Sequence, residues 1–332
     1  MSVVLVTGSS GMVGRNLCRH LKNNQFEVIG LDYQTPDSPP DLQPESIKPW
    51  LGSFGLDGFL KYRLGENSDD LRASILEKLN GVEYVIHLAS QSHVDRSISH
   101  PQQFVIDNVA GTLELLEMCR SLPNLQRIVH FSTDEVVACV ESGSAKEDAT
   151  FRCGSVYSAT KGAQELLVQA YIKTHKLPIV TTRCVNIFGP EQNIEKFIPK
   201  IVWSAVNDQK VPIYGDGSQT REWVHVDHVC DVINWAMLNT YMPNGKVVHI
   251  VGTKEIQNIV IANLILGRLG KSHLIEHVAD RLGHDVRYSL DAGDAHVVWD
   301  MPTYQGSFVR DLFKTVDWYL GKLVKELPDG IR

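Results

Sequence analysis

The stretch Val3-Val4-Leu5-Val6-Thr7-Gly8-Ser9-Ser10-Gly11-Met12-Val13-Gly14 decides the fold of this chain. Its apolar start predicts a buried strand, its glycines predict a tight turn, and a helical pattern follows over Met12 to Lys22. Glycine is needed where a turn is tight and where backbone approaches a pyrophosphate, which the N-terminus of the next helix then faces. The stretch therefore predicts a strand, turn and helix that bind a dinucleotide. The alternative is a glycine-rich turn that binds nothing.

The second predicted strand, Phe26 to Leu31, strengthens the dinucleotide hypothesis because an acid follows it. A carboxylate at Asp32 would accept hydrogen bonds from the adenosine ribose and repel a 2′-phosphate, which favours NAD over NADP. Arg15, after the last glycine, is the residue that would favour a phosphate. We expect the cofactor to be NAD, held by Gly8, Ser10, Gly11, Met12, Val13, Gly14 and Asp32.

Strand and helix patterns alternate through the first half of the chain. Strands are predicted at Tyr84 to Leu88, Arg127 to Ser132 and Pro178 to Arg183, and helices at Asp70 to Leu79, Gln102 to Cys119 and Ser155 to His175. Such alternation predicts an α/β fold with a Rossmann-type, doubly wound parallel sheet.

The domain boundary is predicted at residue 186. We expect 1–186 to bind NAD and 187–330 to form mainly a smaller, discontinuous lobe that binds the substrate. The chain is expected to return to the main sheet near Arg221 to Asp227 and Val248 to Val251, within 221–251. Prolines and glycines between Gln34 and Gly58 predict a long surface loop.

Composition excludes several classes of protein. The net charge of −7 and the lack of a basic run argue against a nucleic-acid partner. No apolar run is long enough to span a membrane, and no signal peptide is visible. The six scattered cysteines indicate reduced thiols in a cytoplasmic protein, and no Cys/His spacing indicates a metal.

Two adjacent acids follow the strand that ends near Ser132: Asp134 and Glu135, after Thr133. Ligands bind at the carboxyl ends of parallel strands, where a buried carboxylate is costly. Neighbouring carboxylates push their proton affinities apart, so one can act as an acid and the other as a base. The alternative for this segment alone is a solvated polar loop.

Tyr157 and Lys161 lie four residues apart at the start of a predicted helix, so both face one side. A tyrosine pKa of about 10 is too high for a base at neutral pH. A neighbouring ammonium and an oxidised nicotinamide would lower it, so that Tyr157 could take a proton from a substrate hydroxyl. A tyrosine and a lysine at this spacing are common on ordinary helices. The position of this pair in the helix that follows the acidic strand end strengthens the hypothesis that the pair is catalytic.

The glycine spacing resembles the extended short-chain dehydrogenase/reductase superfamily. His87-Leu88-Ala89 and the asparagine Asn108 also match that superfamily. The resemblance implies that Thr133 binds the substrate oxygen beside the tyrosine and that Lys161 holds the nicotinamide ribose. It also implies further cofactor contacts from Leu88, Ala89, Ser90, Asn108, Ser132, Tyr157, Lys161 and Cys184.

Longer motifs narrow the resemblance to the nucleotide-diphosphate-glucose 4,6-dehydratases, above all those acting on dTDP-glucose. The matching stretches run over nearly the whole chain, among them Ser132 to Val136, Tyr157 to Lys161, Glu195 to Pro199, Arg221 to Val224 and Arg281 to Tyr288. The family implies C4 oxidation, loss of water across C5 and C6, and hydride return to C6, with Thr133, Asp134, Glu135, Tyr157 and Lys161 as catalytic residues. It assigns the substrate pocket to Ser92, His93, Asn186, Lys196, Arg221, Asn258, Arg281 and His284.

Each residue assigned to the substrate has a simpler alternative. An arginine can equally form a surface salt bridge, and His93 can equally make a structural hydrogen bond. The chain also departs from the dehydratase pattern at Gln91, Val137-Ala138, Ile187 and Leu282, which leaves a UDP-sugar or a modified hexose open.

Two other functions compete. A 4-epimerase or uronate decarboxylase of the same fold would use Tyr157 and Lys161 without needing both acids, and a non-catalytic NAD sensor would need none of the five. A homodimer through a four-helix interface is implied by the resemblance. Five leucines on the two predicted helices are compatible with such an interface, and packing in the core of one subunit explains them equally well: Leu113, Leu115, Leu116, Leu166 and Leu167.

Overall fold

The computed structural model describes residues 1–34, 56–65, 69–137, 142–252, 254–279 and 287–323. Its centre is a seven-stranded sheet in the order β10-β6-β5-β4-β1-β2-β3, in which every pair is parallel. The strand order reverses between β1 and β4, so the predicted doubly wound Rossmann-type sheet is confirmed. The strands are β1 (Val3–Thr7), β2 (Glu27–Asp32), β3 (Gly58–Lys61), β4 (Val82–His87), β5 (Arg127–Thr133), β6 (Ile179–Cys184) and β10 (Val247–Ile250).

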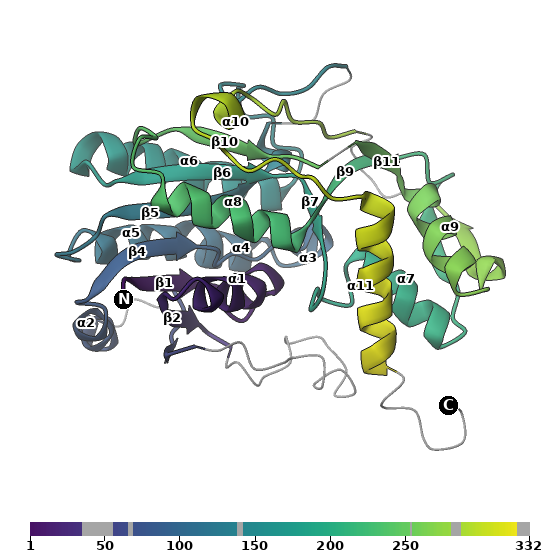
Figure 1. Ribbon diagram of the computed structural model, residues 1–332, viewed down its shortest axis with the longest axis horizontal. Coiled ribbons are helices and arrows are strands. Elements are labelled where there is room, and N and C mark those ends of the chain that lie inside the picture. The colour runs from purple at the N-terminus through teal and green to yellow at the C-terminus, as the bar shows by residue number, and fades with distance from the viewer. Residues whose placement is uncertain (35–55, 66–68, 138–141, 253, 280–286, 324–332) are drawn as a thin grey trace.

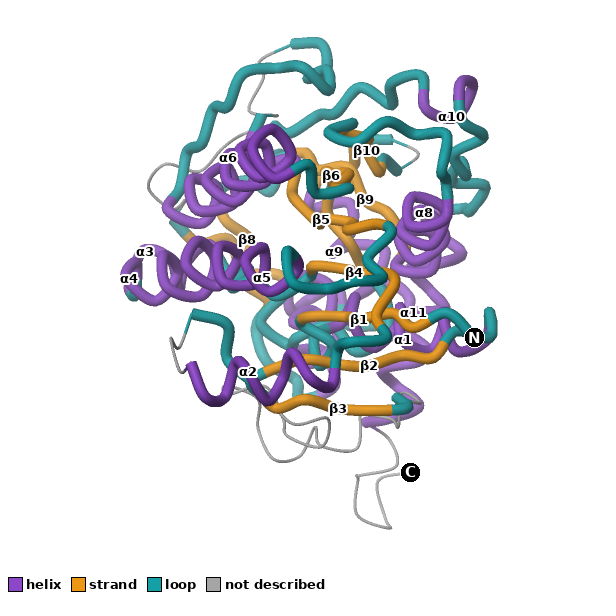
Figure 2. The backbone as a smooth tube through the Cα atoms, turned by 90° about the vertical axis from the view of Figure 1, so that its left-hand side faces the viewer, coloured by secondary structure: helices purple, strands orange, loops and turns teal. Residues whose placement is uncertain are grey.

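Helices cover both faces of this sheet (Figure 2). Helices α1 (Met12–Asn23) and α8 (Val226–Leu238) pack on one face, and α2 (Asp69–Lys78), α5 (Gly111–Cys119) and α6 (Val156–His175) lie on the other. Each face has its own apolar core, because central strands of a parallel sheet are buried on both sides. Because all seven strands are parallel, their carboxyl ends lie at the same edge of the sheet.

A second unit lies beyond that edge (Figure 1). It contains α7 (Phe197–Val206), α9 (Asn258–Arg268), α11 (Phe308–Leu323) and the paired strands β8 (Val211–Tyr214) and β12 (Ile275–Val278). Its core is separate and is formed around Ile201, Ile261 and Leu312. We call this unit the lobe.

Of the two segments expected to return to the main sheet, only β10 does so. Strand β9 (Thr220–His225) instead pairs with β7 (Asn186–Phe188) and β11 (Glu255–Gln257) in a three-stranded sheet, which corrects the expectation for Arg221 to Asp227. The four central side chains of β9 are buried, and a short buried run in the sequence does not by itself specify which sheet the strand joins. The domain boundary at 186 stays a prediction.

The helix predicted over Gln102 to Cys119 is interrupted. It is divided into α4 (Pro101–Phe104), a π-helical segment (Val105–Ala110) and α5. The wider π turn leaves the carbonyl of Asn108 to accept hydrogen bonds from Thr112 Oγ1 (2.6 Å) and Gln164 Nε2 (2.9 Å). Such insertions often occur at functional sites.

The structure also contains elements that the sequence patterns did not predict. Strand β3 extends the sheet beside β2, immediately after residues 35–55, so most of the predicted surface loop lies outside the described residues. The remaining short elements are α3 (Val94–Ser99), α10 (Ala295–Val298) and two 3₁₀ turns (Asp134–Val136 and Ser272–Leu274). Among the described helices, none has the length and apolar character needed to cross a membrane.

Candidate active site

A cleft of about 520 Å³ lies between the carboxyl edge of the main sheet and the lobe. The predicted residues that line it are Gly8, Ser10, Gly11, Met12, Val13, Gly14, Asp32, Leu88, Ala89, Ser90, Ser92, Ser132, Thr133, Asp134, Glu135, Tyr157, Lys161, Cys184, Asn186 and Lys196. They lie at or just after the carboxyl ends of β1, β2, β4, β5 and β6, at the starts of α1 and α6, in β7 and just before α7. The topology therefore brings the turn, the acids and the Tyr157/Lys161 pair into one site.

The glycine turn at one end of the cleft leaves no room for side chains. Gly8 has a φ of +69°, and a Cβ on it would come within 2.7 Å of the Ala89 nitrogen. A Cβ on Gly14 would lie 2.3 Å from the Gly8 carbonyl oxygen. Glycine is thus required where the first helix meets the turn, as a pyrophosphate cradle demands.

Asp32 borders this cradle. Its Oδ2 accepts a hydrogen bond from the Ser10 backbone at 2.9 Å, and its Oδ1 accepts one from the Gln34 backbone at 3.1 Å. Burial raises the pKa of its carboxyl, and these backbone donors oppose that rise. Arg15, in contrast, is buried and its Nε donates to the Ser10 carbonyl at 2.9 Å, so it supports the turn rather than lining the cleft.

The acids begin a 3₁₀ turn at the end of β5. Thr133 caps this turn, because its Oγ1 accepts a hydrogen bond from the Glu135 backbone at 3.3 Å. The same hydroxyl donates to Asp134 Oδ1 at 3.0 Å. The second oxygen of Asp134, Oδ2, is buried without a hydrogen-bond partner. Because burial removes water from the carboxylate, the pKa of Asp134 rises to about 6.

Helix α6 presents Tyr157 and Lys161 from its first turns. A capping box formed by Ser155 and Ser158 fixes its start. Lys161 Nζ donates to the Phe131 carbonyl at 2.7 Å, which ties the helix to β5 just before the acids. Burial lowers the pKa of Lys161 to about 7, and the nearby Glu165 carboxylate opposes this.

Tyr157 is also buried, and burial raises the pKa of its phenol above the ordinary value. The Glu135 charge raises that pKa further, whereas the Thr133 hydroxyl beside the phenol lowers it. An additional cation is therefore needed before Tyr157 can ionise near neutral pH.

Behind Tyr157 and Lys161, a buried network holds the strand end against α6. Ser132 Oγ donates to Glu165 Oε1 at 2.6 Å, and Arg183 Nη2 donates to Glu165 Oε2 at 2.8 Å. Glu165 and Arg183 are at most 3 % exposed, so each charge satisfies the other. The network fixes the spacing between the acids and the Tyr157/Lys161 pair.

Asn108, expected to contact the cofactor, does not line the cleft. Its side chain is fully buried, accepts a hydrogen bond from the Gln91 backbone at 2.7 Å and donates to Thr160 Oγ1 at 2.9 Å. It therefore joins the segment after β4 to α6. The amide of Asn108 thus faces Gln91 and Thr160, and its contact with the cofactor stays a prediction.

Three residues assigned to the substrate pocket also lie off the cleft. His93 Nε2 lies 3.6 Å from Glu195, the Arg221 guanidinium stacks 4.6 Å from the Tyr288 ring centroid, and Asn258 starts α9. The Oδ1 of Asn258 is buried without a hydrogen-bond partner. Arg281 and His284 lie outside the described residues.

Sequence reasoning missed several lining residues. At the Asp32 end, Arg63 lies 5.3 Å from the Tyr33 ring centroid and its Nε and Nη2 contact Asp107 at 3.0 and 3.1 Å. On the lobe side the missed residues are Glu191, Gln192, Asn193, Phe197 and Trp223. Phe197 and Trp223 lie in the stretches that match the dehydratases, Glu195 to Pro199 and Arg221 to Val224, whereas no motif signalled Arg63.

Comparison with known proteins places this site in a family. Residues 4–250 match the family described as NAD dependent epimerase/dehydratase. The chain belongs to this family. It is 36 % identical over 323 residues to the low-salt glycan biosynthesis protein Agl12 of Haloferax volcanii, covering 96 % of this chain and 98 % of that protein.

Other members of the family are similar over nearly the full length. A dTDP-glucose 4,6-dehydratase of Streptomyces antibioticus is 35 % identical over 320 residues, covering 95 % of this chain and 92 % of that protein. The crystal structure of a dTDP-glucose 4,6-dehydratase from Streptomyces venezuelae with NAD bound has a TM-score of 0.84 and 34 % identity. It covers 96 % of this chain and 97 % of that one.

Proposed function

We propose that this chain is an NAD-dependent 4,6-dehydratase that converts a nucleotide-diphosphate hexose, most simply dTDP-glucose, to the 4-keto-6-deoxy sugar. The observation that carries the proposal is the position of Asp134 and Glu135 in one cleft with Tyr157 and Lys161. Oxidation needs only the tyrosine and the lysine, so the acids supply an elimination. The near full-length similarity to named dTDP-glucose 4,6-dehydratases supports the nucleotide and the sugar.

The cleft fits NAD. Gly8, Gly11 and Gly14 line the end of the cleft where a pyrophosphate would lie, and the Asp32 carboxylate beside them suits a ribose diol rather than a 2′-phosphate. The raised pKa of Tyr157 calls for an added cation, which the oxidised nicotinamide provides. The chemistry that bound NAD supplies is hydride acceptance from C4 of the hexose and hydride return at C6.

The side chains move the protons. Tyr157, as phenolate, takes the C4 hydroxyl proton while the Lys161 ammonium stabilises its charge. The resulting ketone acidifies C5, and Glu135 removes the C5 proton. Asp134, whose pKa burial raises to about 6, donates in its protonated form to the C6 hydroxyl, which leaves as water. Glu135 then returns its proton to C5 as the hydride reaches C6.

One proton remains to be returned after each turnover. Tyr157 has gained a proton and Asp134 has lost one, while substrate and cofactor are balanced. The Thr133 hydroxyl donates to Asp134 Oδ1 at 3.0 Å and lies beside the Tyr157 phenol. A shift of two protons through this hydroxyl returns the phenolate and the protonated Asp134 together. Thr133 would thus restore the starting state without solvent.

The substrate would enter from the lobe side. Ser92, Asn186 and Lys196 line that end of the cleft, and Lys196 Nζ donates to the Ser92 carbonyl at 2.7 Å. Lys196 supplies a cation for the substrate diphosphate. The off-cleft positions of Arg221 and Asn258 leave their predicted substrate contacts untested, as do the undescribed Arg281 and His284.

We also propose that the protein forms a homodimer through α5 and α6. Leu113 and Leu166 are 42 % and 54 % exposed on these helices, and Val105 is 50 % exposed beside them. Leu115 and Leu116, in contrast, are buried in the core and cannot serve an interface. Leu166→Glu should shift the mass measured by light scattering from dimer to monomer, while Leu238→Glu, at a site on α8 that is 43 % exposed, should not. A monomeric wild-type protein would contradict the interface.

Isotope transfer tests the proposed reaction. With C4-deuterated dTDP-glucose, a dehydratase should yield a 4-keto product that carries the deuterium at C6. A 4-epimerase would instead return the deuterium to C4 and give no keto sugar. Formation of the 4-keto product from a UDP-, GDP- or CDP-hexose in place of dTDP-glucose would correct the nucleotide but keep the reaction, and no 4-keto product from any of them would contradict the dehydratase.

A further inference from the structure

The loop from Gly189 to Asn193, between β7 and α7, forms a wall of the cleft through Glu191, Gln192 and Asn193. Glu191 has a backbone φ of +65°, in the left-handed region that non-glycine residues rarely adopt. A conformation of this kind persists where surrounding contacts fix it. In this loop the contacts come from both sides.

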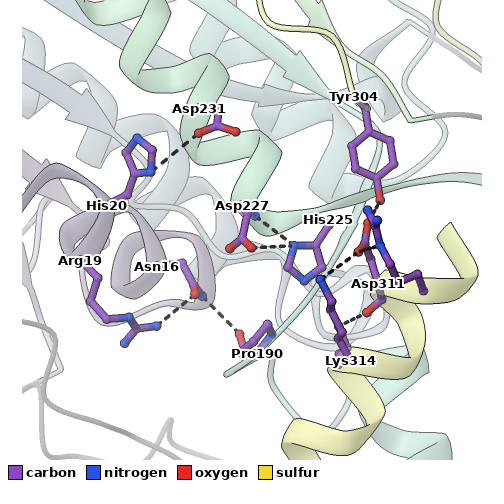
Figure 3. A network of polar contacts seen from close by, with 12 residues as sticks. Asn16, Arg19, His20, Pro190, His225, Asp227, Asp231, Tyr304, Asp311 and Lys314 are labelled. Atoms are coloured by element: carbon purple, nitrogen blue, oxygen red, sulfur yellow. Dashed lines mark hydrogen bonds and ion pairs between the residues drawn. The ribbon is translucent and has the colours of Figure 1, made fainter. Parts of the chain in front are cut away.

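Helix α1 holds the loop from the side of the main sheet. Asn16 Nδ2 donates to the Pro190 carbonyl at 3.2 Å, and Arg19 Nη2 donates to Asn16 Oδ1 at 3.0 Å (Figure 3). The Arg19 guanidinium also contacts both oxygens of Glu191, Nη2 to Oε2 at 2.5 Å and Nη1 to Oε1 at 3.3 Å. The Glu191 side chain is 3 % exposed, so Arg19 neutralises a buried charge.

Helix α11 holds the loop from the lobe. Tyr319 is fully buried, and its hydroxyl lies 3.1 Å from the Gly189 carbonyl oxygen and 3.2 Å from that of Gln192. It also accepts a hydrogen bond from the Gln192 backbone at 3.0 Å. The loop therefore links the helix that follows the glycine turn to the lobe.

We infer that the Arg19–Glu191 pair is a latch that sets the affinity of the cleft for the anionic cofactor, although Arg19 does not itself line the cleft. This inference rests on the proposed function, in which the cleft receives the diphosphates of NAD and of the substrate. A buried Glu191 carboxylate without its cation would repel these anions and would loosen the loop. With Arg19 in place, the wall is neutral and the loop is fixed against α1.

The test is NAD affinity measured by calorimetry on protein freed of copurified NAD. Arg19→Met should weaken NAD binding about tenfold, since it leaves Glu191 charged and unpaired by Arg19. Glu191→Gln should bind within about threefold of wild type, and Arg19→Met combined with Glu191→Gln should recover to that level. Lys22→Met is the matched control, because it removes a cation from the same helix that contacts Asp57 instead.

The affinity for adenosine distinguishes repulsion between Glu191 and the diphosphate from general damage to the site. Adenosine carries no charge, so all variants should bind it equally, whereas a purely structural loss would weaken its binding as well. If Arg19→Met does not fold, Arg19→Gln gives the same test, because glutamine removes the charge but keeps an amide that can donate a hydrogen bond. The latch is overturned if Arg19→Met binds NAD like wild type or if the double variant stays as weak as Arg19→Met. A wild-type protein that binds no NAD would overturn the proposed function itself.

Discussion

The two ends of the cleft are built in different ways. At the cofactor end, Gly8, Gly11, Gly14 and Asp32 come from one short stretch of chain, and the hydrogen bonds of parallel strands set their positions. At the substrate end, Asn186, Gln192, Lys196 and Trp223 come from separate segments that the lobe brings together. The first end is set by local geometry and the second by long-range packing. We therefore expect changes at the cofactor end, and in the catalytic residues beside it, to alter the rate of the reaction. Changes at the substrate end should instead alter the affinity for the substrate.

The largest loss of rate is expected from Tyr157→Phe, which removes the proposed base for the C4 hydroxyl proton. We expect kcat to fall about 10³-fold, in the range typical of acid–base groups, with little change in folding. Steady-state kinetics with dTDP-glucose gives the measurement. Tyr171→Phe is the control, since Tyr171 lies on the same helix but donates to Glu117 away from the cleft. Equal losses in both variants would mean that the helix, not the phenol, was damaged.

A smaller loss is expected when the proton path through Thr133 is removed. Thr133→Val keeps the shape of the side chain but has no hydroxyl to join Tyr157 to Asp134, and kcat should fall about 10²-fold. Thr133→Ser keeps the hydroxyl and should remain within about tenfold of wild type. Rapid-quench kinetics over several turnovers should show that Thr133→Val slows the later turnovers more than the first. If Val and Ser behave alike, Thr133 only caps the turn.

At the substrate end, Lys196→Met should raise KM about tenfold and leave kcat nearly unchanged. Lys196 lines the cleft and contributes a cation for the substrate diphosphate, whereas Lys200, one turn further along α7, is exposed and serves as the control. A fall in kcat with unchanged KM would break the comparison, because it would place Lys196 in the chemistry.

The smallest effect concerns stability. Burial holds the folded pKa of Lys161 at about 7, below its ordinary value, so the unfolded chain binds this proton more tightly. Stability from this group therefore rises as pH increases above about 7, and below that pH the buried charge is unfavourable. Lys161→Met should raise the unfolding temperature of the cofactor-free protein by roughly 2–4 °C at pH 6. Calorimetry should show the gain shrinking as pH rises above neutral, and a destabilised variant would contradict this account.

The sequence predicts the cofactor end well for a physical reason. A strand, a glycine turn and a helix form from neighbouring residues, and parallel pairing places Asp32 and Thr133 to Glu135 at the same edge. Arg63, Glu191 and Gln192 could not be found in this way, because their positions depend on β3 and the lobe. The π-helical turn at Asn108 and the pairing of β9 with β7 were missed for the same reason. The catalytic and binding roles themselves stay predictions.

The division of labour between the two acids is the central claim, and single-turnover kinetics of Glu135→Gln tests it most directly. Tyr157 and Lys161 are intact in this variant, so mixing it with dTDP-glucose should reduce the bound NAD at close to the wild-type rate. Without a base for the C5 proton, water should not be eliminated, and the absorbance of the reduced cofactor should persist. Normal formation of the 4-keto-6-deoxy product by Glu135→Gln would contradict the account.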